Sequence, residues 1–189
     1  WAVGDVDWHR RVVWVEPSDD PGRSRWAGSG GALSIEVGHA IRRMMSATDR
    51  PAATTRRAVA QLDLLREDFP FAAEARTTLE RDQQRQRTRW WTFAGGRANA
   101  ELARRCATAG IAVGGTDDLS INLLGMPPVE AVQAAVAGPG VEWQVPPTRR
   151  DAVKFSEAVP EESLDVMVRA RDADADGVAR VLAEAVTVA

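Results

Sequence analysis

The stretch RTRWWTFAGGRANAELA at residues 87–103 constrains the fold more than any other part of the 189-residue chain. Its first half alternates between two sets of side chains, which is the period of a strand and directs Trp90 and Trp91 to opposite sheet faces. Its second half has the spacing of a helix over about 97–109. Gly95-Gly96 lies between the two patterns and permits a tight turn and a close approach to another chain. The stretch therefore predicts a strand that passes through a glycine turn into a helix.

Strand and helix patterns also cover most of the remaining chain. Strands are expected in a hairpin within 2–16 and at 76–82, 87–94, 111–114, 118–124 and 141–145. Helices are expected between Ser34 and Pro51, and over 54–67, 97–109, 128–137 and most of the last forty residues. The first two helices are expected to bury apolar faces, formed by Val37, Ile41, Met44 and Met45, and by Ala58, Leu62 and Leu65.

These patterns predict an α+β fold, with a mainly antiparallel sheet flanked by helices and a helical C-terminal tail. We expect residues 1–146 to form one α+β domain. Residues 147–189 are expected to form a linker and a helical extension that packs on that domain.

The composition excludes several classes of protein. A hydrophobic content of 44% and a charged content of 27% are typical of a globular domain. No run of about eighteen apolar residues occurs, so no membrane span is expected. The first residues have no signal-peptide pattern and no initiator Met, which suggests a piece of a longer protein. The single Cys106 fits a reducing compartment, and a cytoplasmic location is expected.

Motifs of catalysis and metal binding are missing from the sequence. There is no Walker A loop, no Gly-x-Ser-x-Gly elbow and no cysteine–histidine spacing for zinc. The run Asp172 to Gly177 resembles the start of a calcium loop, but its twelfth position is Ala183 where a bidentate Glu is required. We therefore expect no catalytic residue, metal or cofactor in this chain.

The basic and aromatic residues leave two interpretations open. All but one of the 24 basic residues are arginine, and the chain has seven tryptophans and no tyrosine. Arginine and tryptophan are usual contacts of single-stranded nucleic acid, although a GC-rich genome produces the same bias. The net charge of −3 restricts such binding to a local patch.

The candidates for that patch come from two segments. In the first, the expected backbone contacts are Arg89, Arg97 and Asn99, and the expected stacking ring is Trp90 or Trp91. In the second, the candidates are Arg23, Arg25 and Trp26. The alternative is that the two adjacent tryptophans are core residues and that Gly95-Gly96 is only a turn.

Part of this stretch resembles a known family. WWTFAGGRANAELA is similar to the Trp-Thr-Phe-Ala-Gly-x-Arg-Ala-Asn signature in the C-terminal regions of bacterial superfamily 2 DEAD/DEAH-box helicases related to the large helicase-related (Lhr) proteins. VEPSDDPGRSRWAGSGGALSIEVGHAIRRMM and VKFSEAVPEESLDVMVRARDADADGVARVLAE resemble segments that lie before and after that signature. The chain contains no motor motif, so the resemblance is to the accessory region that follows the motor.

The resemblance implies a non-motor domain of an ATP-dependent DNA helicase, of the kind that serves DNA repair. It would bind or guide single-stranded DNA or RNA beside the motor domains of the same polypeptide, and only those domains would use ATP and Mg²⁺. The alternative is a protein–protein docking module without nucleic-acid contact. In that case Trp26 and the exposed member of the Trp90/Trp91 pair would anchor the interface.

Overall fold

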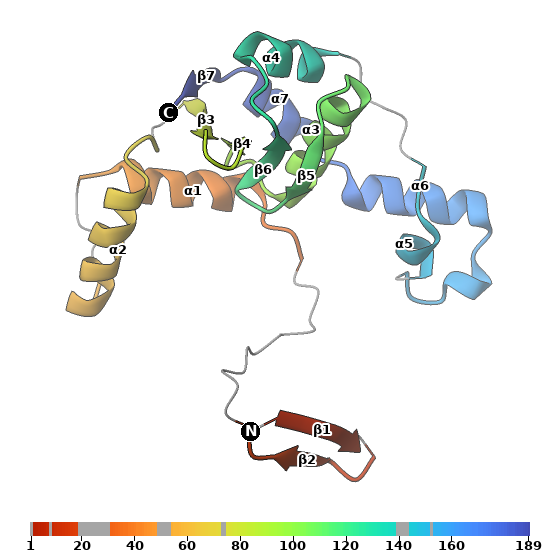
Figure 1. Ribbon diagram of the computed structural model, residues 1–189. Helices are drawn as coiled ribbons and strands as arrows, with labels where there is room; N and C mark the ends of the chain where they lie inside the picture. The colour runs from red at the N-terminus through yellow and green to blue at the C-terminus, as the bar shows by residue number, and fades with distance from the viewer. Residues whose placement is uncertain are drawn as a thin grey trace. The chain divides into compact units, whose positions relative to one another are not determined.

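The computed structural model describes residues 2–7, 9–18, 31–48, 54–72, 75–138, 144–151 and 153–189. The chain forms two compact units, Trp1–Gly31 and Ala32–Ala189. The first unit contains a hairpin of β1 (Ala2–Asp7) and β2 (Val12–Glu16), which pair antiparallel as predicted (Figure 1). An irregularity in register lies between Val3 and Asp5.

The second unit is built on a five-stranded sheet with the order β5-β6-β4-β3-β7. The strands are β3 (Arg76–Asp82), β4 (Arg87–Trp91), β5 (Val113–Thr116), β6 (Ser120–Leu124) and β7 (Ala185–Val188). All neighbours pair antiparallel except β3 and β7, which are parallel. The mainly antiparallel sheet and its helices confirm the predicted α+β class.

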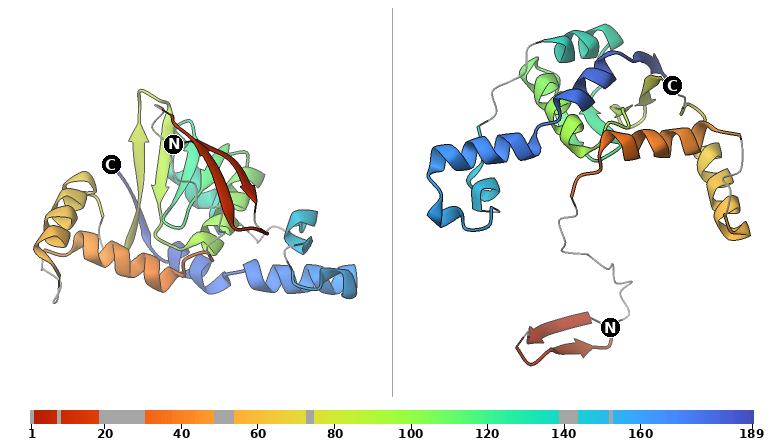
Figure 2. Two further views of the ribbon diagram at one scale, coloured as in Figure 1. Left: turned by 90° about the horizontal axis from the view of Figure 1, so that it is seen from below. Right: turned by 180° about the vertical axis from the view of Figure 1, so that it is seen from behind.

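The helices of the second unit lie between and beside the strands of this sheet, and some of them cover its faces. They are α1 (Ile35–Ser46), α2 (Arg56–Asp68), α3 (Gly96–Thr108), α4 (Val129–Ala137), α5 (Pro147–Asp151), α6 (Glu161–Asp172) and α7 (Ala175–Leu182), with a 3₁₀ turn at Ser156–Ala158. In Figures 1 and 2, α3, α4 and α7 lie on one side of the sheet and α1 lies on the other.

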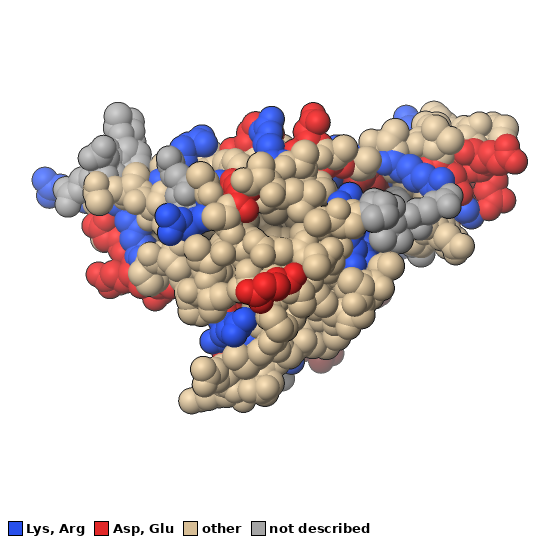
Figure 3. Space-filling view, turned by 90° about the horizontal axis from the view of Figure 1, so that it is seen from above, with Lys and Arg blue, Asp and Glu red and all other residues tan. Residues whose placement is uncertain are grey.

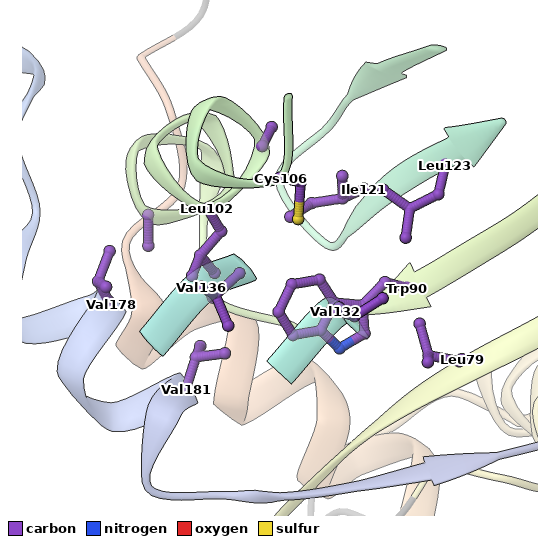
Figure 4. Close-up of a cluster of buried hydrophobic side chains, with 13 residues drawn as sticks. Leu79, Trp90, Leu102, Cys106, Ile121, Leu123, Val132, Val136, Val178 and Val181 are labelled. Carbon is purple, nitrogen blue, oxygen red and sulfur yellow. The ribbon is translucent and has the colours of Figure 1, made fainter. Parts of the chain in front are cut away.

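The larger core fills the space between the sheet and α3, α4 and α7. Trp90 of β4 is 1% exposed and is surrounded by apolar side chains from the sheet and from all three helices (Figure 4). The cluster that contains it also includes Leu79, Leu102, Cys106, Ile121, Leu123, Val132, Val136, Val178 and Val181. The helix predicted over 97–109 therefore packs as expected, with Leu102 and Cys106 on its buried face.

A second, smaller core lies on the opposite face of the sheet. Trp91 contacts the rings of Phe69 and Phe93, at centroid distances of 4.9 and 5.9 Å. Ile41 and Met45 of α1 pack against this cluster. The two adjacent tryptophans therefore occupy different cores, because successive strand residues point to opposite faces.

The buried side of α1 differs from the predicted apolar face. Val37 and Met44 are exposed, and the helix instead buries Ile35, Gly38 and Arg42. Arg42 is 4% exposed because its guanidinium forms a two-pronged ion pair with Glu184, just before β7. A paired charge can occupy a buried position that periodicity assigns to an apolar side chain.

The C-terminal segment is helical over α5, α6 and α7, in agreement with the predicted tail. Its last residues differ, because Ala185–Val188 form a strand beside β3. Residues 147–189 belong to the same compact unit as the sheet. The run of aspartates begins α7 in the expected way, since the Asp174 side chain accepts a hydrogen bond from Gly177 N at 2.8 Å.

Candidate nucleic-acid interface

The segment between β4 and α3 is held by the loop that precedes β6. The backbone nitrogens of Thr92 and Phe93 both donate to the Leu119 oxygen, at 3.1 and 2.9 Å. Gly95 N donates to the Asp118 oxygen at 2.9 Å. This pairing satisfies these three backbone N–H groups where the chain passes from the end of β4 to the start of the helix.

The double glycine is required by a close approach within the chain itself. Gly95 has a φ of +84°, and a Cβ at this position would lie 2.3 Å from the Leu33 oxygen. A Cβ on Gly96 would lie 2.5 Å from Asp118 Oδ1, which accepts a hydrogen bond from Leu33 N at 3.0 Å. The glycines thus admit the segment that leads into α1, which explains them without a ligand.

Asn99 is not available to a nucleic acid, contrary to the prediction. Its side chain is fully buried in the first turn of α3. Oδ1 accepts a hydrogen bond from Thr92 Oγ1, and Nδ2 donates to the Asp117 oxygen at 2.9 Å. The amide joins α3 to the two loops beside it, so its role is structural.

The expectation that Trp90 or Trp91 offers a stacking ring is also wrong. Trp90 and Trp91 are 1% and 6% exposed, because elements pack on both faces of the sheet around them. Their indole N–H groups donate to Thr77 Oγ1 and Glu80 Oε2, at 2.9 and 2.8 Å. The burial of both rings removes them as interface anchors as well.

Arg89 and Arg97 are both exposed, but they line different hollows. Arg97 lies at the start of α3, beside a hollow that also contains the acidic Asp174 and Asp176. The structure therefore does not bring these two arginines into one site. The predicted patch of Arg23, Arg25 and Trp26 lies outside the described residues.

Arg89 belongs to a polar depression beside the β3–β4 hairpin, which we call the arginine hollow. Its volume is about 620 Å³, and it is lined by residues 80–85, residues 87–89 and Asn122 of β6. Four of these lining residues are arginines and two are acidic: Arg81, Arg85, Arg87, Arg89, Glu80 and Asp82. The sequence signal for this site is the run RDQQRQRTR at 81–89, which the prediction treated mainly as strand and turn.

Both carboxylates of the arginine hollow are already engaged. Asp82 pairs with Arg85 at 3.3 Å and also accepts from the backbone nitrogen of that residue. Glu80 accepts the indole N–H of Trp91. The side chain of Arg87 is exposed and makes no hydrogen bond or ion pair with any residue that the structure describes. Four arginines and two carboxylates line the hollow, which therefore has an excess of positive charge that favours an anion.

The face shown in Figure 3 has separate basic and acidic groups among a larger uncharged area (Figure 3). Nor is Cys106 a candidate for chemistry, because burial raises the pKa of its thiol to about 11. Among the sites described above, the arginine hollow is the one with an excess of arginines over carboxylates.

None of the protein families, curated proteins or solved structures compared with this chain matches it. Within the described ranges, no cluster of three or more histidine, cysteine, aspartate and glutamate side chains is suited to hold a metal ion. The described helices are all too short or too polar to cross a membrane.

Proposed function

We propose that this chain is a non-motor accessory domain that binds single-stranded nucleic acid at the arginine hollow. The observation that carries the proposal is the placement of Arg87 and Arg89 at alternate positions of β4, on the same face of the sheet. Asp82 and Glu80 stand opposite them on β3, and each of these carboxylates has its own partner. Arginine side chains with unsatisfied donors are the usual partners of phosphate.

The resemblance to the C-terminal regions of Lhr-type helicases supports the same proposal. It implies that this domain holds or guides the strand on which adjacent ATP-dependent motor domains move. The proposal places no ATP, Mg²⁺ or catalytic group in this chain. Because Trp90 and Trp91 are both buried, the proposed contact relies on phosphate pairing and not on base stacking.

Fluorescence anisotropy of a labelled single-stranded oligonucleotide tests the proposal. Binding is measured at about 50 and 200 mM salt for the wild type and for Arg87→Ala/Arg89→Ala. A matched control is Arg56→Ala/Arg57→Ala, which removes two exposed arginines from the first turn of α2. Thermal melting of each variant confirms that it is folded.

We expect salt-sensitive binding that only the hollow variant weakens. Each lost phosphate contact lowers the slope of log affinity against log salt by about 0.7, so the double variant loses about 1.4. Equal binding by the two double variants, or no binding by the folded wild type at low salt, would refute the proposal.

A second candidate function, docking to another protein, is favoured by helix α2. None of its residues is buried, and Leu64 and Leu65 are 54% and 47% exposed. An apolar surface of this kind is typical of a contact with a partner. If the folded chain does not bind nucleic acid at low salt, the result would favour docking to another protein over nucleic-acid binding. Helix α2 is then the surface to examine first.

A further inference from the structure

Arg89 differs from the other arginines of the arginine hollow because its guanidinium is held from two sides. Its Nε donates to Asn122 Oδ1 at 3.1 Å, on the adjacent strand β6. Its guanidinium carbon lies 5.1 Å from the centroid of the Trp91 ring, within the range of a cation–π contact. One bond and one stacking contact therefore define the plane of the group.

The Trp91 ring, which lies against the guanidinium of Arg89, is itself fixed by its neighbours. Its ring packs edge-on against Phe69, stacks beside Phe93 and donates its N–H to Glu80 at 2.8 Å. Because the ring is 6% exposed, it has little freedom to move away from Arg89. The buried aromatic thus contributes to the site by orienting an arginine, which is a different role from stacking on a base.

The terminal nitrogens of Arg89 are the donors that remain. A guanidinium has five N–H groups, and Asn122 takes only the one on Nε. The four on Nη1 and Nη2 make no hydrogen bond to any residue in the described ranges. Two parallel N–H groups of this kind match two oxygens of a phosphate.

The neighbouring arginines have other arrangements. Arg85 is paired with Asp82, and Arg81 donates to the Pro127 oxygen at 3.2 Å. Arg87 has no such partners, so it contributes positive charge without a defined orientation. Only Arg89 therefore combines a fixed plane with free terminal donors.

We infer that Arg89 is a preorganised phosphate-binding residue and that Asn122 is its positioning residue. The hollow then binds the phosphodiester backbone of a single strand and does not discriminate between bases. This inference rests on the proposed function and specifies its ligand chemistry. A strand presents a phosphate at every nucleotide, so it can engage the oriented Arg89 and the exposed Arg87 together. Among the described residues that line the hollow, none is aromatic, so none of them can select a base by stacking.

Lysine substitutions test whether the planar guanidinium of Arg89 matters beyond its charge. Arg89→Lys keeps the charge but loses the two parallel N–H groups, and Arg87→Lys is its matched control on the same strand face. We expect Arg89→Lys to weaken binding of a labelled single strand about tenfold, while Arg87→Lys changes it less than about threefold. The salt slope should stay constant, because both variants keep the number of cations.

A double-mutant cycle tests the positioning role of Asn122. Asn122→Ala should weaken binding about tenfold in the wild-type background and have no effect in the Arg89→Ala background, because the amide acts only through that arginine. A merely structural role of Asn122 would give the same loss in both backgrounds. Melting temperatures, recorded for every variant, separate unfolding from loss of binding.

The ligand class is tested with homopolymer strands and an acidic peptide. Strands of different bases should bind within about threefold of each other, and a polyglutamate peptide should not compete at equal charge concentration. Strong base preference or effective competition by the peptide would overturn the ligand assignment.

These experiments distinguish failure of the positioning role of Asn122 from failure of the proposed nucleic-acid binding itself. Equal affinities of the two lysine variants, or additive effects of Asn122→Ala and Arg89→Ala, would overturn the positioning role while the Arg87→Ala/Arg89→Ala loss upholds the proposed function. Absence of binding by the folded wild type would overturn both.

Discussion

Replacement of Asn99 by alanine should lower the stability of the domain and leave nucleic-acid binding by the folded protein unchanged. The side chain is fully buried and joins Thr92 Oγ1 to the backbone oxygen of Asp117. Alanine can make neither bond, and it leaves a small void in the first turn of α3. The substitution therefore tests whether this signature asparagine is a structural residue or a ligand contact.

The magnitude of the effect follows from the partners left behind. The Asp117 oxygen loses the donor at 2.9 Å, and an unsatisfied buried acceptor costs about 1–3 kcal/mol. Thr92 keeps a long contact from its Oγ1 to the Leu119 oxygen at 3.4 Å, so its loss is only partial. With the void included, we expect a decrease of about 2–4 kcal/mol in the free energy of unfolding.

Guanidinium denaturation followed by tryptophan fluorescence measures this change, because Trp90 and Trp91 are both buried in the folded state. A thermal melt should show a shift on the order of 5–10 °C. The matched control is Asn122→Ala, where the half-exposed amide holds only Arg89 and water can replace it. We expect that control to lose under about 1 kcal/mol of stability.

The two asparagines should therefore show opposite effects. Asn99→Ala should affect stability and spare binding, while Asn122→Ala should affect binding and spare stability. If folded Asn99→Ala bound a single strand as weakly as Arg89→Ala does, Asn99 would have to contact the ligand and the structural role would be refuted. Equal stability of Asn99→Ala and Asn122→Ala would contradict the burial argument.

Three further predictions concern other buried contacts. Glu184→Gln should lower the free energy of unfolding by about 3 kcal/mol, because it leaves the charge of Arg42 buried without a counter-ion; an unchanged denaturation midpoint would contradict this. Gly38→Ala should cost about 1–3 kcal/mol, since the new Cβ would lie 2.1 Å from the Phe93 oxygen and the backbone must move; a wild-type melting curve would argue against that packing. Cys106 should resist alkylation in the native protein at pH 8 and react in denaturant, because a pKa of about 11 keeps its buried thiol protonated; rapid native labelling would show that the thiol is exposed.

Local patterns predicted much of the central fold, and the segment from β3 to α3 shows why. The alternation over 76–91 and the turn at Gln83–Gln86 involve neighbours in the chain, and the structure has β3 and β4 at those positions. The helix after Gly95-Gly96 follows from spacing alone, and it is α3. Short-range periodicity carries this information because a strand and a helix repeat after two and 3.6 residues.

Burial of individual residues was predicted less well where distant segments decide it. Periodicity assigned Ala58, Leu62 and Leu65 to a buried face of the second helix, yet α2 buries none of its residues. For Arg42 the reverse holds, because a carboxylate 142 residues away in the sequence stabilises it inside the protein. No local pattern encodes either result, since each depends on which element packs alongside.

The sequence by itself determined the order of strands and helices from β3 to α4, the opposite directions of Trp90 and Trp91, and the glycine turn at residues 95–96. These are properties of backbone conformation and side-chain period, which act over a few residues. Only the tertiary structure decided that both tryptophans are covered, that Asn99 joins loops and that Arg89 lies between Asn122 and Trp91. Exposure and partners depend on strand register and on the packing of segments far apart in the chain, and a residue pattern does not contain that information.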